Sequence, residues 1–502
     1  MYLIFLVLST IISLILSYVS YKYRYWERKG VPQLKPQFFF GSFFELDSIH
    51  KTKLIRKVYQ QFKDGKTKIA GTYVYTKPAV VILDFEIIKS ILIKDFNYFL
   101  DRFANRSENM TGPLDMQLFL CPGDKWRHLR IKLTPTFTSL KMKGMFPTVL
   151  EVAKQLDAAF RLHVSKTPNE DMELHEMMAR YTTDIIGHCA FGVECNSLKD
   201  PNVEFRHMGR KVFYPQYFSI RWRIFQLTYP HLFKIFTFFN YRRFALDVEQ
   251  FITHLVRETV RIREEQNIKR NDFLNLLMEM RHQKDENGQP LMTTENMAAQ
   301  VFAFFIAGFE TSSSNLSFGI YELAKNPHIQ DKLRAEIMSV MAKHNGKLTY
   351  EAIQDMTYLD CVMTETIRMY PALAAITRIT TEDYKIPGMD VVIEKDTHVW
   401  IPAKEIHYDP DVYENPTEFR PERFSPEEVQ KRHPQAFLGF GDGPRNCIGL
   451  RFARMEVRVG LITLLTNYRF TTTEKTPKHV EISKYSSVLV PHSKLYVKVE
   501  KL

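Results

Sequence analysis

The stretch FGDGPRNCIG, residues 440–449, places one cysteine, Cys447, in a turn rich in glycine. Glycine lets the backbone turn tightly and approach a flat ligand closely, and Pro444 stiffens the turn. Backbone amides around the sulfur, and a helix predicted to begin at about Ile448, would stabilise a thiolate. A single thiolate ligand suits haem iron rather than zinc. The alternative is a buried structural thiol.

A second unusual stretch, AGFETS at residues 307–312, lies inside an apolar helix predicted over residues 296–325. Its glycine weakens the helix, and the acid Glu310 should not be buried without a partner. Thr311 lies one turn after Ala307 and can donate a hydrogen bond to its carbonyl. Together these residues predict a notch that could admit a ligand and relay a proton. The alternative is a close helix crossing with the acid pointing to water.

Two further pairs of charged or aromatic residues are separated by one helical turn. Glu365 and Arg368 share a helix face, and Arg423, in the turn FRPERF, could join them in a structural charge cluster. An exposed helix pair is the alternative. Trp126 and Arg130 could converge on one anion, or belong to a basic helix that packs its tryptophan inward.

The composition excludes several classes of protein. The chain has 502 residues, 45% of them hydrophobic, which is enough for a large core. Its five cysteines are irregularly spaced and include no C-x-x-C, so disulfide frameworks and structural zinc both lack their signature. The net charge of +11 suggests an acidic partner or surface, but no basic cluster with interleaved aromatics predicts nucleic-acid binding.

The N-terminus predicts a membrane anchor. Residues 1–21 form an apolar run without charges, and a helix of about 20 apolar residues can cross a bilayer. Positive charges, beginning at Lys22, follow this run, which favours an uncleaved signal anchor with the rest of the chain in the cytosol. We expect residues 22–41 to form a basic linker that contains prolines, and residues 42–502 to form one domain without a further linker.

The remaining pattern predicts a mainly α fold with a small β-rich region. Helical periodicity dominates segments such as 150–162 and 246–266, and β-branched runs gather at 74–83 and 486–500. Residues 213–244 are dense in aromatic and basic side chains. They could dip into a bilayer or form a buried aromatic core, and the nearby anchor favours membrane contact.

Taken together, these motifs resemble those of the cytochrome P450 superfamily, the haem-thiolate monooxygenases. Residues 440–449 look like its haem-binding signature, and 307–312 resemble its oxygen-activating helix motif. ETIR and PERF, at 365–368 and 421–424, are similar to its E-x-x-R pair and the matching arginine segment. Residues 179–201 are further similar to insect microsomal members, which are often involved in xenobiotic or hormone metabolism. The resemblance implies a cytochrome P450 fold preceded by a transmembrane helix.

The resemblance also implies roles for individual residues. Cys447 would be the axial ligand of haem b (iron protoporphyrin IX), with Phe440 beside it. Glu310 and Thr311 would deliver protons to bound oxygen. The other residues implied to bind the cofactor are Gly443, Arg445, Gly449, Trp126, Arg130, Arg378, Ala307 and Gly308. The implied structural triad is Glu365, Arg368 and Arg423.

The implied reaction inserts one atom of O2 into lipophilic small molecules, such as plant toxins, insecticides, or endogenous lipids and hormones. The chain lacks a G-x-G-x-x-G nucleotide motif, so NADPH would act through NADPH–cytochrome P450 reductase, with cytochrome b5 as a second partner. The acidic surface of the reductase would meet the basic residues Lys125, Arg127 and Lys132.

The implied location is the endoplasmic reticulum membrane, with one anchoring helix and the catalytic domain on the cytosolic face. The predicted substrate-pocket residues are Phe305, Phe309, Ala372 and Leu489. Two other classes of function stay open: a haem-thiolate isomerase or dehydratase that acts on peroxides without a reductase, and a non-catalytic haem sensor. The intact Glu310–Thr311 pair and the membrane anchor argue against the isomerase.

Overall fold

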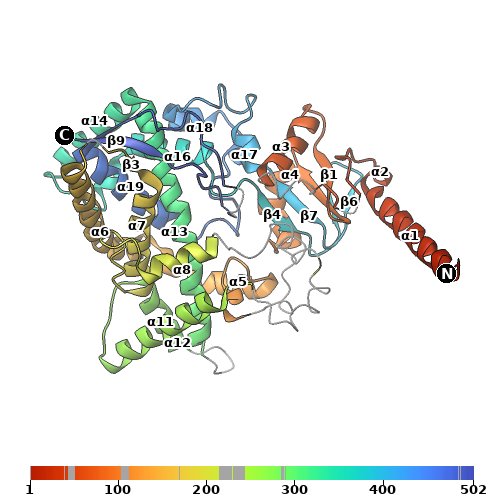
Figure 1. Cartoon of the computed structure of the whole chain (residues 1–502), viewed down its shortest axis with the longest axis horizontal. Helices are drawn as coiled ribbons and strands as arrows, with labels where there is room; N and C mark the ends of the chain where they lie inside the picture. Colours follow the sequence, from red (N-terminus) through yellow and green to blue (C-terminus); the bar gives the residue numbers. More distant parts are fainter. Residues whose placement is uncertain are drawn as a thin grey trace.

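The computed structural model describes residues 2–38, 40–42, 51–102, 112–168, 170–213, 229, 243–283, 288, 290–483, 486 and 488–502. Helices dominate these residues, and the largest sheet lies on the side of the molecule nearest the N-terminal helix (Figure 1). This is the predicted fold class, mainly α with a small β-rich part. Most of the aromatic segment 213–244 lies outside the described residues, so its contact with a membrane stays a prediction.

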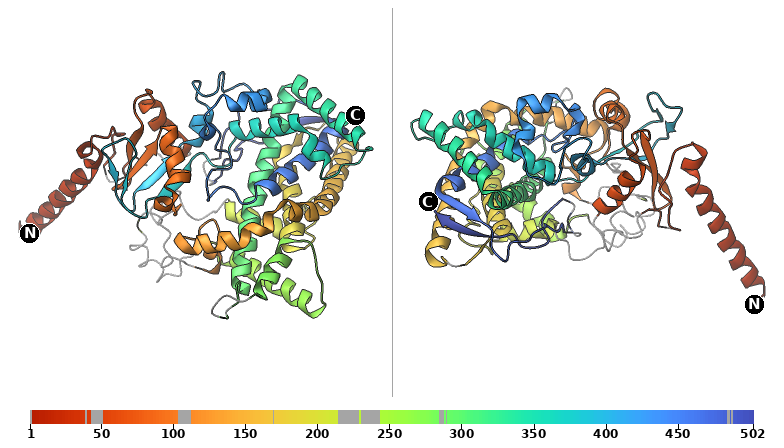
Figure 2. Two further views of the ribbon diagram at one scale, coloured as in Figure 1. Left: turned by 180° about the vertical axis from the view of Figure 1, so that it is seen from behind. Right: turned by 90° about the horizontal axis from the view of Figure 1, so that it is seen from above.

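The N-terminal helix α1 (Tyr2–Tyr23) is long and apolar enough to cross a membrane. Nearly all of its side chains are exposed, and it projects away from the body of the protein (Figure 2). The short helix α2 (Tyr25–Arg28) follows within the predicted linker. Its Trp26 is fully buried and donates a hydrogen bond to the Thr72 carbonyl at 3.1 Å. The start of the linker is therefore packed against the sheet.

The largest sheet has the strand order β1–β2–β7–β4. Strands β1 (Ile69–Val74) and β2 (Lys77–Ile82) pair antiparallel, β7 (His398–Ile401) adds to β2 in parallel, and β4 (Ile376–Ile379) pairs antiparallel with β7. The other strands are β3 (Met172–Glu173), β5 (Tyr384–Lys385), β6 (Val392–Ile393), β8 (Tyr468–Thr471) and β9 (Tyr496–Lys501). Because Arg378 lies on β4 opposite Val399, the sheet fixes the position of one predicted site residue.

The long helix α13 (Thr294–Lys325) lies at the centre of the helical part and contacts helices from both halves of the chain. The Thr293 hydroxyl caps it by accepting the Asn296 backbone N–H. The other helices are α3 (Lys51–Phe62), α4 (Phe85–Lys89), α5 (Gly123–Leu133), α6 (Ser139–Lys166), α7 (Leu174–Ile186), α8 (Glu204–Phe213), α11 (Leu246–Glu265), α12 (Phe273–Arg281), α14 (Pro327–Lys343), α15 (Ala352–Asp355), α16 (Thr357–Met369), α17 (Ala403–His407), α18 (Pro426–Gln430) and α19 (Leu450–Asn467). The predicted helix over 296–325 is confirmed.

Short helical turns connect these elements. They are the π-helical turns η2 (Ser90–Lys94) and η7 (Gly187–Phe191) and the 3-10 turns η3 (Phe96–Phe99), η5 (Pro113–Met116), η6 (Thr134–Phe137), η8 (Pro421–Phe424) and η9 (Pro434–Ala436). The turn η8 holds Arg423, as FRPERF predicted. Helix α16 ends at Met369, two residues before Pro371, where the proline was expected to end it.

Helix α13 crosses α7 closely at Gly308. A Cβ atom at this position would lie 2.3 Å from Cδ1 and 3.0 Å from Cγ1 of Ile186. The close-crossing interpretation of this glycine is therefore correct for its packing against α7. The contact also fixes the rotation of α13 about its own axis, and therefore which face of α13 points away from α7.

We expect Gly308→Ala to lower the free energy of unfolding. Overpacking against Ile186 should destabilise by about 1–3 kcal/mol, which outweighs the gain of about 1 kcal/mol in helix propensity. Ile186→Val removes Cδ1, so the same substitution should be less harmful in that background. The urea midpoints of the four variants measure this difference. Equal effects of Gly308→Ala in both backgrounds would contradict the packing argument.

Candidate active site

The loop that carries Cys447 is held by glycines and by neighbouring backbone. Gly441 and Gly443 have φ angles of 73° and 69°, a region that favours glycine. At Gly443 a Cβ atom would also fall 1.8 Å from the Leu92 carbonyl oxygen of η2, so no other residue fits there. The Cys447 N–H donates to the Phe440 carbonyl at 2.9 Å and closes the loop. The chain then enters α19 at Leu450, close to the predicted helix start.

The Cys447 thiol combines surface accessibility with a crowded environment. Its side chain is exposed, yet burial by the surrounding residues raises the pKa of the thiol. Three groups act in the opposite direction and lower this pKa: the Gly449 backbone N–H and the guanidinium groups of Arg102 and Arg130. The loop therefore presents a sulfur whose surroundings supply the contacts that favour a thiolate.

Arginine side chains gather beside this loop. Arg445 and Arg378 are 2% and 1% exposed, and within the described part of the chain the Nε atom of each lacks a hydrogen-bond partner. Burial and the repulsion of Arg445 lower the pKa of Arg378 to about 9, and burial lowers that of Arg445 to about 10. Arg102 donates to the Arg445 carbonyl at 2.7 Å. Such buried positive charge requires anions nearby.

Trp126 and Arg130 both lie on α5, as predicted, but they have different partners. Arg130 donates to the backbone oxygen of Asn446 at 2.9 Å and to its side-chain oxygen at 2.8 Å. Trp126 is buried, and the guanidinium carbon of Arg445 lies 4.6 Å from the centre of its ring. Helix α5 thus contacts the two residues of the cysteine loop that directly precede Cys447. Binding of one anion by the two residues together stays a prediction.

One face of α13 opens in the middle of an otherwise buried helix. Ala307 is exposed and Thr311 partly buried, whereas Phe305 and Phe309 are fully buried. The Thr311 hydroxyl donates to the Ala307 carbonyl, as predicted from their spacing. This opening is what a ligand between α13 and the cysteine loop would need.

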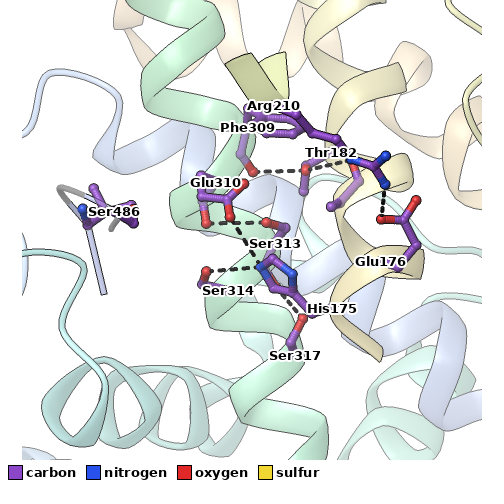
Figure 3. Close-up of polar contacts among 12 residues, drawn as sticks. His175, Glu176, Thr182, Arg210, Phe309, Glu310, Ser313, Ser314, Ser317 and Ser486 are labelled. Carbon is purple, nitrogen blue, oxygen red and sulfur yellow. Dashed lines mark hydrogen bonds and ion pairs between the residues drawn. The ribbon is translucent and has the colours of Figure 1, made fainter. Parts of the chain in front are cut away.

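Glu310 points away from this opening. It is 1% exposed, and its Oε1 lies 3.4 Å from Nε2 of His175 on α7 (Figure 3). The expectation that it points to water in the close-crossing alternative is therefore wrong, because the carboxylate is buried against the His175 imidazole instead.

The predicted charge cluster is present. Arg368 donates from two nitrogens to the Glu365 carboxylate at 2.7 and 2.9 Å, and Nε of Arg423 lies 3.4 Å from the same carboxylate. The Arg420 N–H donates to it at 2.9 Å. Glu365 and Arg368 are fully buried, so this is not the exposed helix pair of the alternative.

His407, on α17, connects this cluster to the cysteine loop. Its Nε2 accepts a hydrogen bond from the Leu438 N–H at 2.9 Å, so the proton is on Nδ1, which donates to the Arg368 carbonyl at 3.0 Å. Burial and the charge of Arg368 lower the pKa of this imidazole to about 3, which keeps it neutral. A neutral ring is needed, because only then can one nitrogen accept and the other donate.

The predicted pocket residues occupy different positions. Phe305 and Phe309 pack against α8, where a Cβ atom on Gly209 would lie 3.0 Å from the Phe305 ring. Phe309 also lies under the Arg206 guanidinium at 4.9 Å. Leu489 is buried, and its N–H donates to the carbonyl of the partly exposed Ala372 at 2.9 Å. Their contact with a substrate stays a prediction.

Comparison with known proteins agrees with these observations. A family model described as Cytochrome P450 matches residues 31–499. The chain is a cytochrome P450. Cytochrome P450 6a8 of Drosophila melanogaster is 41% identical over 99% of both chains, and cytochrome P450 6a2 of the same species is 42% identical over 98% of both. The predicted resemblance to insect members is confirmed, and the protein is an oxidoreductase of the monooxygenase class.

Cytochromes P450 carry haem iron and use O2, and the residues of this P450 fit that cofactor. Cys447, whose side chain is uncovered, would supply one thiolate, and Ala307 is exposed on α13. The Nε atoms of Arg378 and Arg445, which lack partners among the described residues, could bind the carboxylates of two propionates. These carboxylates would compensate the buried positive charge of the site.

Three residues of this site were not predicted from the sequence: Arg102, His175 and His407. Each makes its main contact with a residue distant in the chain, such as His407 with Leu438 or Arg102 with Arg445. Only the dipeptide His407-Tyr408 before an Asp-Pro turn could have drawn attention, and a turn of that kind is common.

The neutral state of His407 predicts a pH dependence of stability. The unfolded chain binds a proton on this imidazole at about pH 6.5, whereas the folded protein binds it only at about pH 3. Its contribution is therefore fully present above pH 6.5 and declines as the pH falls, by about 1.4 kcal/mol per pH unit. His407→Gln should unfold at lower urea at pH 7.5 and show a flatter decline between pH 6.5 and 4.5. Parallel curves for variant and wild type would contradict this role.

Proposed function

We propose that this cytochrome P450 oxygenates lipophilic small molecules with electrons supplied by an NADPH-dependent flavoprotein reductase. The observation that carries the proposal is the glycine-framed loop that leaves the Cys447 side chain exposed near the buried guanidinium groups of Arg378 and Arg445. A site of this kind suits a flat cofactor that carries carboxylates. Xenobiotics, such as plant toxins or insecticides, and endogenous lipids or hormones are the substrate classes proposed.

In this proposal Cys447 would ligate the iron of haem b, and its electron-rich sulfur would supply the thiolate that suits the cofactor to oxygen activation. Phe440 is proposed to lie beside the sulfur. The proposed propionate-binding residues are Arg130, Arg378, Arg445 and Trp126. The other proposed cofactor contacts are Gly443 and Gly449 of the loop and Ala307 and Gly308 of α13. Substrate contacts come from Phe305, Phe309, Ala372 and Leu489.

The protein's own acid–base groups supply protons to the reaction. Insertion of one oxygen atom into a C–H bond consumes two electrons and two protons and releases the other oxygen atom as water. Thr311 holds its hydroxyl at the open face of α13, and Glu310 is the adjacent acid. Their proposed role is to hold and transfer these protons. The buried triad Glu365, Arg368 and Arg423 has the structural role of fixing the cysteine loop.

The proposed electron donor is NADPH–cytochrome P450 reductase, with cytochrome b5 as a second partner. Helix α5 carries basic residues next to the cysteine loop, of which Lys125 is exposed and Arg127 and Lys132 are partly exposed. An acidic partner docked there would be steered by charge and weakened by salt.

The proposed domain arrangement follows the chain: an anchor at 1–21, a linker at 22–41, and a catalytic domain at 42–502. The exposed apolar helix α1 supports the anchor. The positive charges after it support placement of the catalytic domain on the cytosolic face of the endoplasmic reticulum membrane. Membrane lipid is then the partner of α1 and supplies lipophilic substrates.

Reconstitution with reductase and NADPH in lipid vesicles tests the proposed function. With a panel of lipophilic compounds under labelled O2, we expect one labelled oxygen atom per product and substrate-dependent NADPH consumption. Thr311→Ala should lower product formation by about tenfold or more and raise peroxide release, because proton transfer is impaired. Product without the label, or turnover that needs no NADPH, would instead indicate an isomerase-type reaction. No substrate-dependent consumption across the panel would contradict the proposal.

A further inference from the structure

The buried ion pair between α13 and α7 has no role in the reaction as described so far. The Glu310 carboxylate lies 3.4 Å from Nε2 of His175, and the Ser314 hydroxyl lies 3.5 Å from the same nitrogen. Figure 3 shows the carboxylate and the imidazole turned toward each other across the two helices. Glu310 is also the residue next to Thr311, whose hydroxyl lies on the open face of α13, while the Glu310 side chain points toward α7.

The two members of the pair differ in their access to water. The side chain of Glu310 is 2% exposed, whereas that of His175 is 16% exposed. Glu310 therefore cannot exchange protons with solvent directly, while the imidazole can. A proton that reaches the carboxylate through this contact must pass through the imidazole.

Besides Glu310, charged groups from two other places face this imidazole. Glu173, which precedes α7, accepts the His175 backbone N–H at 3.1 Å and adds negative charge. Arg206 of α8 adds positive charge, but it donates to Glu176 at 2.8 Å and is partly neutralised there. Burial lowers the pKa of His175, and Glu310 and Glu173 raise it by more, so the net direction is upward. The imidazolium form is thus available near neutral pH.

We propose that His175 is the proton-relay residue that recharges Glu310 during oxygenation. The N–H bond at Nε2 breaks, an O–H bond forms at Oε1 of Glu310, and the neutral imidazole then takes a proton from water. No electrons move in these steps, and the protons are those that oxygen insertion consumes. The inference rests on the proposed function, because it extends the proton supply of Glu310 and Thr311 to the solvent.

A purely structural role is the competing explanation, in which the ion pair only holds α7 against α13. The two explanations differ in what a neutral hydrogen-bonding substitute can do. His175→Gln retains an N–H donor that can reach a carboxylate but cannot release a proton. His175→Lys retains a cation that can release one, although with a higher pKa.

The functional test uses the full chain, loaded with haem and reconstituted with reductase. His175→Gln should lower kcat by about tenfold, leave KM unchanged, and divert NADPH electrons from product to peroxide. His175→Lys should recover part of the product yield, with its pH profile shifted upward. His344→Gln is the matched control, since it removes a surface histidine–carboxylate pair with Asp355, and it should behave as wild type.

A second readout does not depend on turnover. Because the folded pKa of His175 is raised, the pair stabilises the protein fully below about pH 6.5, and this contribution is lost as the pH rises through the folded value. In urea unfolding, His175→Gln and Glu310→Gln should each remove this pH-dependent part, and the double variant should remove no more. This measurement establishes whether the pair is charged in the folded protein.

The outcomes separate the possibilities. Loss of the pH-dependent stability with unchanged kcat and product yield in His175→Gln would overturn the relay and leave a structural pair. Unchanged pH dependence in all variants would overturn it as well, since the pair would not be charged. If the wild type itself inserts no labelled oxygen, the proposed function fails and the relay fails with it, whatever the unfolding data show.

Discussion

The buried carboxylate of Glu365 is the constraint on which the site depends. A carboxylate removed from water requires full compensation, and here two guanidinium groups and one backbone N–H supply it. Removing one partner of such a pair destabilises a protein by about 3–5 kcal/mol. Arg368 also donates a hydrogen bond to the His407 carbonyl, and the Leu438 N–H donates one to the His407 ring. These hydrogen bonds connect the buried charge cluster to the start of the cysteine loop. The position of Cys447 is thus tied to the core.

Two faces of helix α13 have different roles. Gly308 allows it to approach α7, and Glu310 forms its ion pair on that helix as well. Thr311, one residue later, directs its hydroxyl to the carbonyl of Ala307 on the open face. Since successive side chains of a helix point about 100° apart, one short motif can serve both a packing contact and a reaction space.

What could be predicted from the sequence were the contacts within one helical turn. Glu365 with Arg368, and Thr311 with Ala307, follow from spacing alone, and the fold class followed from periodicity and from a resemblance carried by Cys447 and its glycines. The contacts of His175, His407 and Arg102 could not be predicted. Their partners lie far away in the chain, and periodicity does not specify which helices meet.

Some predicted residues proved to have partners other than those expected. Trp126 and Arg130 share a helix, but Trp126 lies against Arg445, whereas Arg130 donates a hydrogen bond to Asn446. The linker was expected to be semi-rigid and to form no regular element, but the short helix α2 lies at its start, where Trp26 is buried against Gly71. In both cases the contacts depend on tertiary packing, which the local sequence does not specify.

The central claim is that Cys447 binds haem iron as a thiolate. The absorption spectrum of the reduced, carbon monoxide-bound protein tests it most directly, because the axial ligand determines the position of the Soret band. We predict a band shifted far to the red of that of a histidine-ligated haem, and loss of this shift in Cys447→Ser. An unshifted band in the wild-type protein would contradict the claim.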